Sequence, residues 1–169
     1  ANTVIPQIFA TAMGVPISML KIVSADTDLT PDAGKTSASR QTFVSGNAAR
    51  LSGEALRSKI LEKLNVGPDA ILTISSGRIL ASDAAKTHLI DLTTLEPNDD
   101  GFIFSATETY DPPTKPLDKN GQGEPYAQFG YAAHIAVVEI DTVMATTKPI
   151  KFVAAHDVGR AINPVLVEG

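Results

Sequence analysis

Two stretches in the first 64 residues carry the apolar spacing of a helix. Between Thr3 and Met13 the apolar residues recur along one helical face, and Gly14 followed by Pro16 supplies a stop. A longer pattern predicts a second helix over roughly Arg40–Leu64, with its apolar positions in two stripes. Because two stripes indicate cover on more than one side, we expect this helix to be packed against several neighbours.

Small residues interrupt the long helical pattern at Gly46, Ala49 and Gly53. A glycine inside a helix costs about 1 kcal/mol relative to alanine unless close packing repays it. We therefore expect another part of the backbone to approach the helix at these positions.

Short apolar runs bounded by turn residues predict β-strands. The pair Ala70–Ser75 and Gly77–Ala81 meets at Ser76-Gly77, which is typical of a β-hairpin. A buried strand is predicted at Ser18–Val23, and further short strands at His88–Leu92 and Phe102–Thr107.

The last third of the chain combines a long loop with two strong strands. The proline- and glycine-bearing stretch Asp111–Pro125 predicts a loop, and loops of this length in compact domains are commonly functional or interfacial. Strands are predicted at Ala132–Asp141 and Ile150–Ala155, the first so continuously apolar that cover on both faces is expected. The pattern predicts an α/β fold, with helices against a mixed sheet in a single domain over residues 1–169.

Composition narrows the possible partners and compartments. The chain is 43% hydrophobic and 20% charged with a net charge of -5, and its Lys and Arg residues form no dense basic patch. This excludes binding to nucleic acid or to an anionic membrane. There is no cysteine, and no apolar run nears the roughly 20 residues of a membrane-spanning helix. The first residues lack the basic start of a signal peptide, so a cytoplasmic location is expected.

The polar stretch Pro31–Thr42 precedes the long helix and contains Gly34-Lys35-Thr36, the end of a phosphate-binding loop motif. That motif needs a glycine five residues before, so that the backbone can wrap the anion, and Leu29 stands there instead. A nucleotide-binding domain is therefore disfavoured.

The second half of this stretch still suits an anion rich in acceptor atoms. Hydroxyls, an amide and a guanidinium lie before a helix whose N–H groups and positive dipole end point at the loop. The alternative is that Ser39 only caps the helix and its neighbours are solvated. The side chains concerned are Ser37, Ser39, Arg40, Gln41 and Thr42.

Two long runs resemble one known family. The run DTDLTPDAGKTSASRQTFVSGNAA from Asp26 to Ala49, continued by LSGEALRSKILEKL, is similar to the molybdopterin-binding region of the xanthine dehydrogenase and aldehyde oxidase family. So is YAAHIAVVEID followed by KFVAAHDVGRAINPVLVEG, from Tyr131 to Gly169. The order and spacing of the segments match over nearly the whole chain.

The resemblance implies a role in oxidising purines, related N-heterocycles or aldehydes, with water as the oxygen source. It places the loop against molybdopterin and its pyrophosphate, with Ala38 closest to the metal. Because the pterin dithiolene supplies the sulfur ligands of molybdenum, no metal ligand is expected from this chain. The implied cofactor contacts are Thr36, Ser37, Ala38, Ser39, Arg40, Gln41 and Thr42.

Departures from the family pattern suggest a section truncated at both ends. The family's Gly-Gln-Gly segment before the first helix is missing, and so is its general base, because Glu168 belongs to another element of the pattern. We expect partners that supply the remaining molybdopterin-binding segments and the iron-sulfur and FAD subunits or domains. The chain alone should neither turn over substrate nor hold the cofactor tightly, and a catalytically silent assembly domain is the alternative.

Other polar residues are predicted to be structural. His156-Asp157 makes a poor catalytic pair because neighbours on a strand point to opposite faces, and Asp157 with Arg160 and Asn163 should instead fix the turn that follows. His88 and His134 make no metal-binding spacing with each other, and Asp26 and Asp28 should tie the loop before Pro31. Lys35 is either exposed or directed at an anion.

Overall fold

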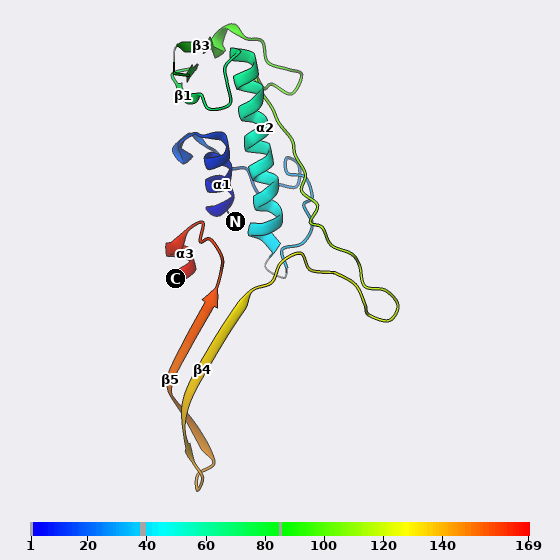
Figure 1. Ribbon diagram of the computed structural model, residues 1–169, viewed down its shortest axis with the longest axis vertical. Coiled ribbons are helices and arrows are strands. Elements are labelled where there is room, and N and C mark those ends of the chain that lie inside the picture. The colour runs from blue at the N-terminus through cyan, green and yellow to red at the C-terminus, as the bar shows by residue number, and fades with distance from the viewer. Residues whose placement is uncertain (1, 38–39, 85) are drawn as a thin grey trace. The chain divides into compact units, whose positions relative to one another are not determined.

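The computed structural model describes residues 2–37, 40–84 and 86–169 (Figure 1), which fall into two compact units, Ala1–Asp111 and Pro112–Gly169. The first unit contains the helices α1 (Val4–Met13) and α2 (Gly46–Leu64). A π-helical segment, η2 (Gln41–Ser45), leads directly into α2. Both helices predicted from the apolar spacing are therefore confirmed. That the two units form one domain stays a prediction.

The glycines of α2 lie where α1 packs against it, and Figure 1 shows the two helices side by side. A Cβ atom added at Gly53 would lie 2.9 Å from the carbonyl oxygen of Phe9 and 3.0 Å from the Cβ of Ala12. One added at Gly46 would lie 2.9 Å from the Cδ1 of Ile8. The predicted close approach of another backbone is confirmed at Gly53.

A three-stranded antiparallel sheet follows α2, in the order β1 (Ile71–Ser75), β2 (Arg78–Ser82) and β3 (Thr87–Asp91). The predicted hairpin is confirmed: Ser76 and Gly77 both have positive φ, 49° and 74°, as a type I′ turn requires. Alternate residues of β1 and β2 are buried, so one face of the sheet packs on the core. The core joins this face to the end of α2 and the segment after α1, and its buried members are Met13, Val15, Ile60, Leu61, Leu64, Ala70, Leu72, Ile79 and Ala81.

A single guanidinium connects three segments at the edge of this core. Arg57 on α2 donates to the carbonyl of Met13 at 3.0 Å, to that of Pro68 at 3.2 Å and to that of Ala70 at 2.5 Å. These carbonyls lie at the end of α1 and just before β1, outside the regular ladders. Arg57 therefore satisfies three backbone acceptors that lie outside the helix and strand ladders.

Two predicted strands are wrong. Ser18–Val23, fully described, contains the end of a 3₁₀ turn, η1 (Ile17–Met19), followed by irregular chain in which only Leu20 packs against the core. Phe102–Thr107, also fully described, has no ladder either, although Phe104 contacts the core. Both runs anchor single apolar side chains, and a strand additionally needs a neighbouring backbone to pair with, which composition alone does not reveal. A short 3₁₀ turn, η3 (Leu92–Thr94), ends the sheet.

The second unit is dominated by one long hairpin of β4 (Tyr131–Asp141) and β5 (Thr146–Asp157), followed by the short helix α3 (Pro164–Glu168). Its register shifts between Val137 and Val138, opposite Pro149, which cannot donate to the ladder. Residues 112–130, all described, contain only an isolated bridge between Lys115 and Glu124, so the predicted loop is confirmed.

The expectation that the first of these strands is covered on both faces is wrong for this chain. Every residue of β4 and β5 is exposed, with Ile135 at 63% and Phe152 at 66% of their accessible surface. The apolar pattern is that of a covered strand, but the described residues supply no cover for it. The α/β class with packed helices is confirmed, and the pairing within both sheets is antiparallel. Among the described residues, no helix is long and apolar enough to cross a membrane.

Candidate functional site

The polar loop predicted to hold the cofactor leads into η2. The described part of it consists of residues 31–37 and 40–42, whereas the predicted contacts Ala38 and Ser39 lie outside the described residues. Thr36, Ser37 and Thr42 are exposed, and Arg40 and Gln41 are half-buried where the helix begins. The loop therefore presents hydroxyls at the surface and a guanidinium and an amide at its base.

Aspartates shape the approach to the loop. The Oδ1 atom of Asp26 accepts from the backbone N–H groups of Asp28 and Leu29, at 3.0 and 3.1 Å. Asp32 accepts from the N–H of Gly34 at 2.7 Å. Such local bonds replace secondary structure in a segment that has none. The predicted tying role of Asp26 is confirmed, whereas Asp28 contributes only its backbone N–H.

Arg40 faces the loop itself. Its Nη1 donates to the carbonyl oxygen of Lys35 at 2.8 Å and to that of Ala33 at 3.3 Å. The backbone N–H of Arg40 donates to the carbonyl of Ser37 at 3.1 Å. Arg40 thus holds the loop in shape with one nitrogen, and none of the described residues accepts a side-chain hydrogen bond from its Nε or Nη2.

Gln41 is oriented by Thr36. The hydroxyl of Thr36 lies 3.2 Å from Oε1 of Gln41, which fixes this oxygen as the acceptor and leaves the amide NH₂ as a donor. Among the residues that the structure describes, none accepts a hydrogen bond from that NH₂ group. Two N–H donors at the start of a helix suit phosphate or pterin oxygens.

The π-helical turn is a further sign of a functional position. The N–H of Gly46 reaches back to the carbonyl of Gln41, five residues earlier, and π-bulges occur frequently at functional sites. The ring of Phe43 in this turn meets that of Tyr110 edge to face, with centroids 5.6 Å apart. This contact holds the helix start against the last residues of the first unit.

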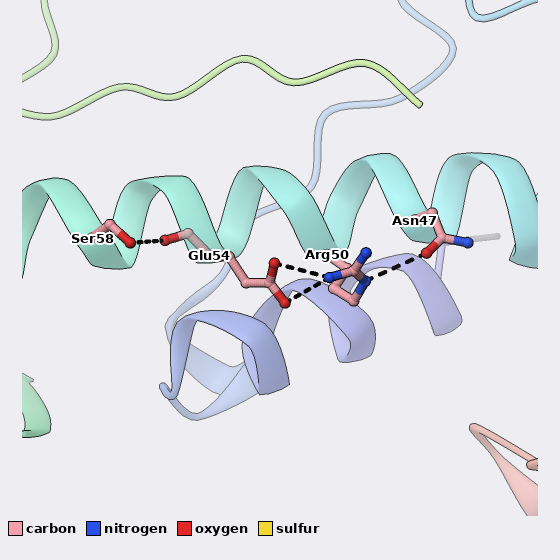
Figure 2. Close-up of polar contacts among 4 residues, drawn as sticks. All are labelled: Asn47, Arg50, Glu54 and Ser58. Carbon is pink, nitrogen blue, oxygen red and sulfur yellow. Dashed lines mark hydrogen bonds and ion pairs between the residues drawn. The ribbon is translucent and has the colours of Figure 1, made fainter. Parts of the chain in front are cut away.

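A polar ladder marks another side of α2, starting one turn after the loop (Figure 2). Arg50 donates to both carboxylate oxygens of Glu54 at 2.8 and 2.9 Å, and its Nε lies 3.4 Å from Oδ1 of Asn47. The hydroxyl of Ser58 donates to the carbonyl of Glu54 at 2.9 Å. Residues three and four apart share one helix face, so this ladder stabilises α2 from the side while Gly53 faces α1.

The remaining predicted residues take structural positions. Asp157 accepts from the N–H of Gly159 at 2.9 Å, and Asn163 caps α3 by accepting from Leu166, so both fix the final turn as expected. His88 lies 3.9 Å from Asp83. Lys35 is exposed, and its carbonyl binds Arg40. Across the described ranges, no group of three or more His, Cys, Asp and Glu residues is placed to hold a metal ion.

Two arrangements were missed by sequence reasoning. One is the clamp of Arg57 on three carbonyls, and the other is the approach of His134 to His156, with 3.0 Å between their Nε2 atoms. Each depends on segments far apart in the chain. Only a known strand register would have brought the two histidines together, and apolar periodicity does not specify that register.

The whole chain, residues 1–169, matches the family model described as the molybdopterin cofactor-binding domain. The chain belongs to this family. It is 30% identical to the xanthine dehydrogenase molybdenum-binding subunit of Escherichia coli O157:H7, with 100% of the chain and 22% of that protein aligned. It is 26% identical to the carbon monoxide dehydrogenase large chain of Hydrogenophaga pseudoflava, over 99% of the chain and 20% of the relative. The resemblance identified in the sequence is confirmed.

The fold has a counterpart among solved structures. The crystal structure of the Cu,Mo-CO dehydrogenase in its carbon monoxide reduced state aligns with a TM-score of 0.66 and 23% identity, which shows a shared fold. The alignment covers 98% of this chain and 20% of that one. The chain therefore spans about a fifth of the length of the relatives it matches.

Proposed function

We propose that this chain is the molybdopterin-binding section of a molybdenum-dependent hydroxylase or dehydrogenase that oxidises purines, related N-heterocycles or aldehydes with water as the oxygen source. The observation that carries the proposal is the family match over residues 1–169. The names of the relatives, a xanthine dehydrogenase subunit and a carbon monoxide dehydrogenase large chain, agree in chemical class. When bound, molybdopterin would supply the redox chemistry of the reaction.

The chain's own contribution is to bind and orient this cofactor. The NH₂ group of Gln41 and the exposed hydroxyls of Ser37 and Thr42 form a donor set that fits pyrophosphate and pterin oxygens. Arg40 keeps the loop in the conformation that presents them, through its bonds to two loop carbonyls. Thr36 donates to Oε1 of the Gln41 amide and so leaves the NH₂ group as its donor side. Ala38 and Ser39 remain proposed contacts of the same loop.

The partners we propose are the other molybdopterin-binding segments of a longer polypeptide, together with iron-sulfur and FAD subunits or domains. The fully exposed hairpin of β4 and β5 supports this, because strands so rich in apolar residues are normally covered. We propose that further segments of the same polypeptide cover this hairpin, since the chain spans only about a fifth of the length of its relatives. The isolated chain is proposed to be inactive.

Molybdenum content tests the loop assignment. In the full-length protein, Gln41→Leu should lower the molybdenum bound per polypeptide, measured by elemental analysis, and lower activity in parallel, because two donors to the cofactor are lost. Gln128→Leu, the same change at an exposed position in the other unit, should leave both unchanged. Full metal loading and activity in the Gln41 variant would refute the proposed contact.

The alternative of a catalytically silent assembly domain also draws on the exposed apolar hairpin. It predicts a full-length protein that associates with its partner subunits but binds no molybdenum. Elemental analysis of the purified complex therefore separates the two functions before any variant is made.

A further inference from the structure

Two histidines of the hairpin face each other across its strands. In the register of β4 and β5, His134 pairs with Ala154 and His156 pairs with Ala132, so the histidines are diagonal neighbours on one face. Their Nε2 atoms are 3.0 Å apart and their ring centroids 4.8 Å apart. Since the strands and not a loop present them, their spacing is fixed by the ladder.

The residues around the two histidines restrict the ring of His134 and leave the Nε2 atoms of both rings uncovered in the isolated chain. The ring of Phe152 meets that of His134 edge to face, with centroids 5.7 Å apart, which limits the rotation of this imidazole. The residues directly opposite the histidines, Ala154 and Ala132, have the smallest side chains that could stand there. All of these positions are exposed in the isolated chain, so an ion in solution can reach the two nitrogens there.

The separation matches two neighbouring ligands of one metal ion. At a metal–nitrogen distance of about 2.0–2.1 Å, imidazoles 90° apart place their nitrogens about 2.9 Å from each other, and a tetrahedral angle requires about 3.3–3.4 Å. The observed 3.0 Å corresponds to adjacent corners of a square plane. Square-planar and tetragonal sites with nitrogen and oxygen ligands favour Cu²⁺ or Ni²⁺, and Cu²⁺ binds most tightly among the first-row divalent ions.

We propose that in the isolated chain His134 and His156 form a site for a square-planar divalent metal ion, Cu²⁺ before Ni²⁺, bound through both Nε2 atoms with water completing the plane. Without metal, one Nε2–H donates to the other Nε2. On binding, the ring that donated changes tautomer, its proton moving from Nε2 to Nδ1, so that both Nε2 lone pairs go to the metal and there is no net proton release. The histidine pair belongs to one compact unit and the proposed cofactor loop to the other.

Copper titration of the tag-free 169-residue chain tests the proposal. Calorimetry with Cu²⁺ should give one site per chain, and electron paramagnetic resonance should show a tetragonal spectrum split by two equivalent nitrogens. His134→Gln and His156→Gln should each weaken binding roughly tenfold or more, equivalent to about 1.4 kcal/mol per factor of ten. Ni²⁺ should bind more weakly than Cu²⁺.

The third histidine provides the matched control. His88→Gln removes an imidazole from β3, in the other unit, and should change neither the affinity nor the spectrum. Circular dichroism of each variant checks that the strands persist. Copper binding of undiminished affinity in a folded variant lacking both His134 and His156, or a spectrum with a single coordinating nitrogen in the unaltered chain, would overturn the proposal.

Discussion

Gly53 allows α1 and α2 to pack closely because it has no side chain. The carbonyl of Phe9 and the Cβ of Ala12 occupy the space in which any side chain would begin. Ser, Ala or a larger residue would improve the intrinsic helix propensity of α2 and yet separate it from α1. At this position the close packing of α1 against α2 requires glycine, although glycine has a low intrinsic helix propensity.

We expect Gly53→Ala to destabilise the first unit. The gain of about 1 kcal/mol in helix propensity should be outweighed by an overpacking cost of about 1–3 kcal/mol, since the nearest atom is a backbone oxygen at 2.9 Å. Chemical denaturation followed by circular dichroism measures the change in free energy of unfolding. Gly67→Ala is the control, because nothing lies within 4 Å of its added Cβ. A Gly53→Ala variant as stable as the unaltered chain would contradict the close approach.

Among the elements, the turn of the long hairpin depends on one carboxylate. Oδ1 of Asp141 accepts from the N–H groups of Met144 and Val143, both at 2.9 Å, and these bonds lower the pKa of the carboxyl below 3.8. A pKa that is lower in the folded than in the unfolded state means that the charged form stabilises the fold. This stabilisation is present above the unfolded pKa and is lost as the pH falls through the folded one.

The hairpin should therefore loosen in acid. We expect the signals of the turn residues Val143 and Met144, followed by nuclear magnetic resonance, to be constant from neutral pH to about 4 and to shift as the pH falls below 3.8. In Asp141→Asn, whose side chain cannot ionise, this part of the acid response should disappear. If the variant and the unaltered chain respond to acid identically, another group controls the turn.

At the scale of the whole molecule, the two units differ in how they are stabilised. The first unit buries a core between α2 and one face of its sheet, whereas the strands of the second unit are exposed throughout. Exposed apolar strands with unpaired edges are templates for association. The second unit therefore has the surface of a part that completes a larger assembly.

We expect the isolated chain to self-associate through this hairpin. Replacing Ile135 and Ile150, both exposed, by threonine keeps the β-propensity but removes apolar surface, and should lower the associated fraction seen by analytical ultracentrifugation. Ile71→Thr is the control, because Ile71 is exposed on β1 of the first unit. An isolated chain that stays monomeric at high concentration, or loses association equally in the control, would contradict this role of the hairpin.

The sequence by itself determined the elements whose signal is local. Apolar spacing located α1 and α2, and the dipeptide Ser76-Gly77 located a hairpin turn. The glycines of α2 indicated that another backbone packs closely against this helix. The family also followed from the order of segments along the chain. All of these features depend on residues a few positions apart, or on motifs read in order.

Only the tertiary structure decided which atoms from distant segments meet. It turned one Arg40 nitrogen onto the loop's own carbonyls, joined Arg57 to the end of α1 and to the chain before β1, and set His134 beside His156. It also left Ser18–Val23 without a strand partner and the long hairpin without cover. Strand pairing and hydrogen-bond partners are long-range contacts, chosen by register and by competition among many acceptors, so periodicity along the chain does not contain them.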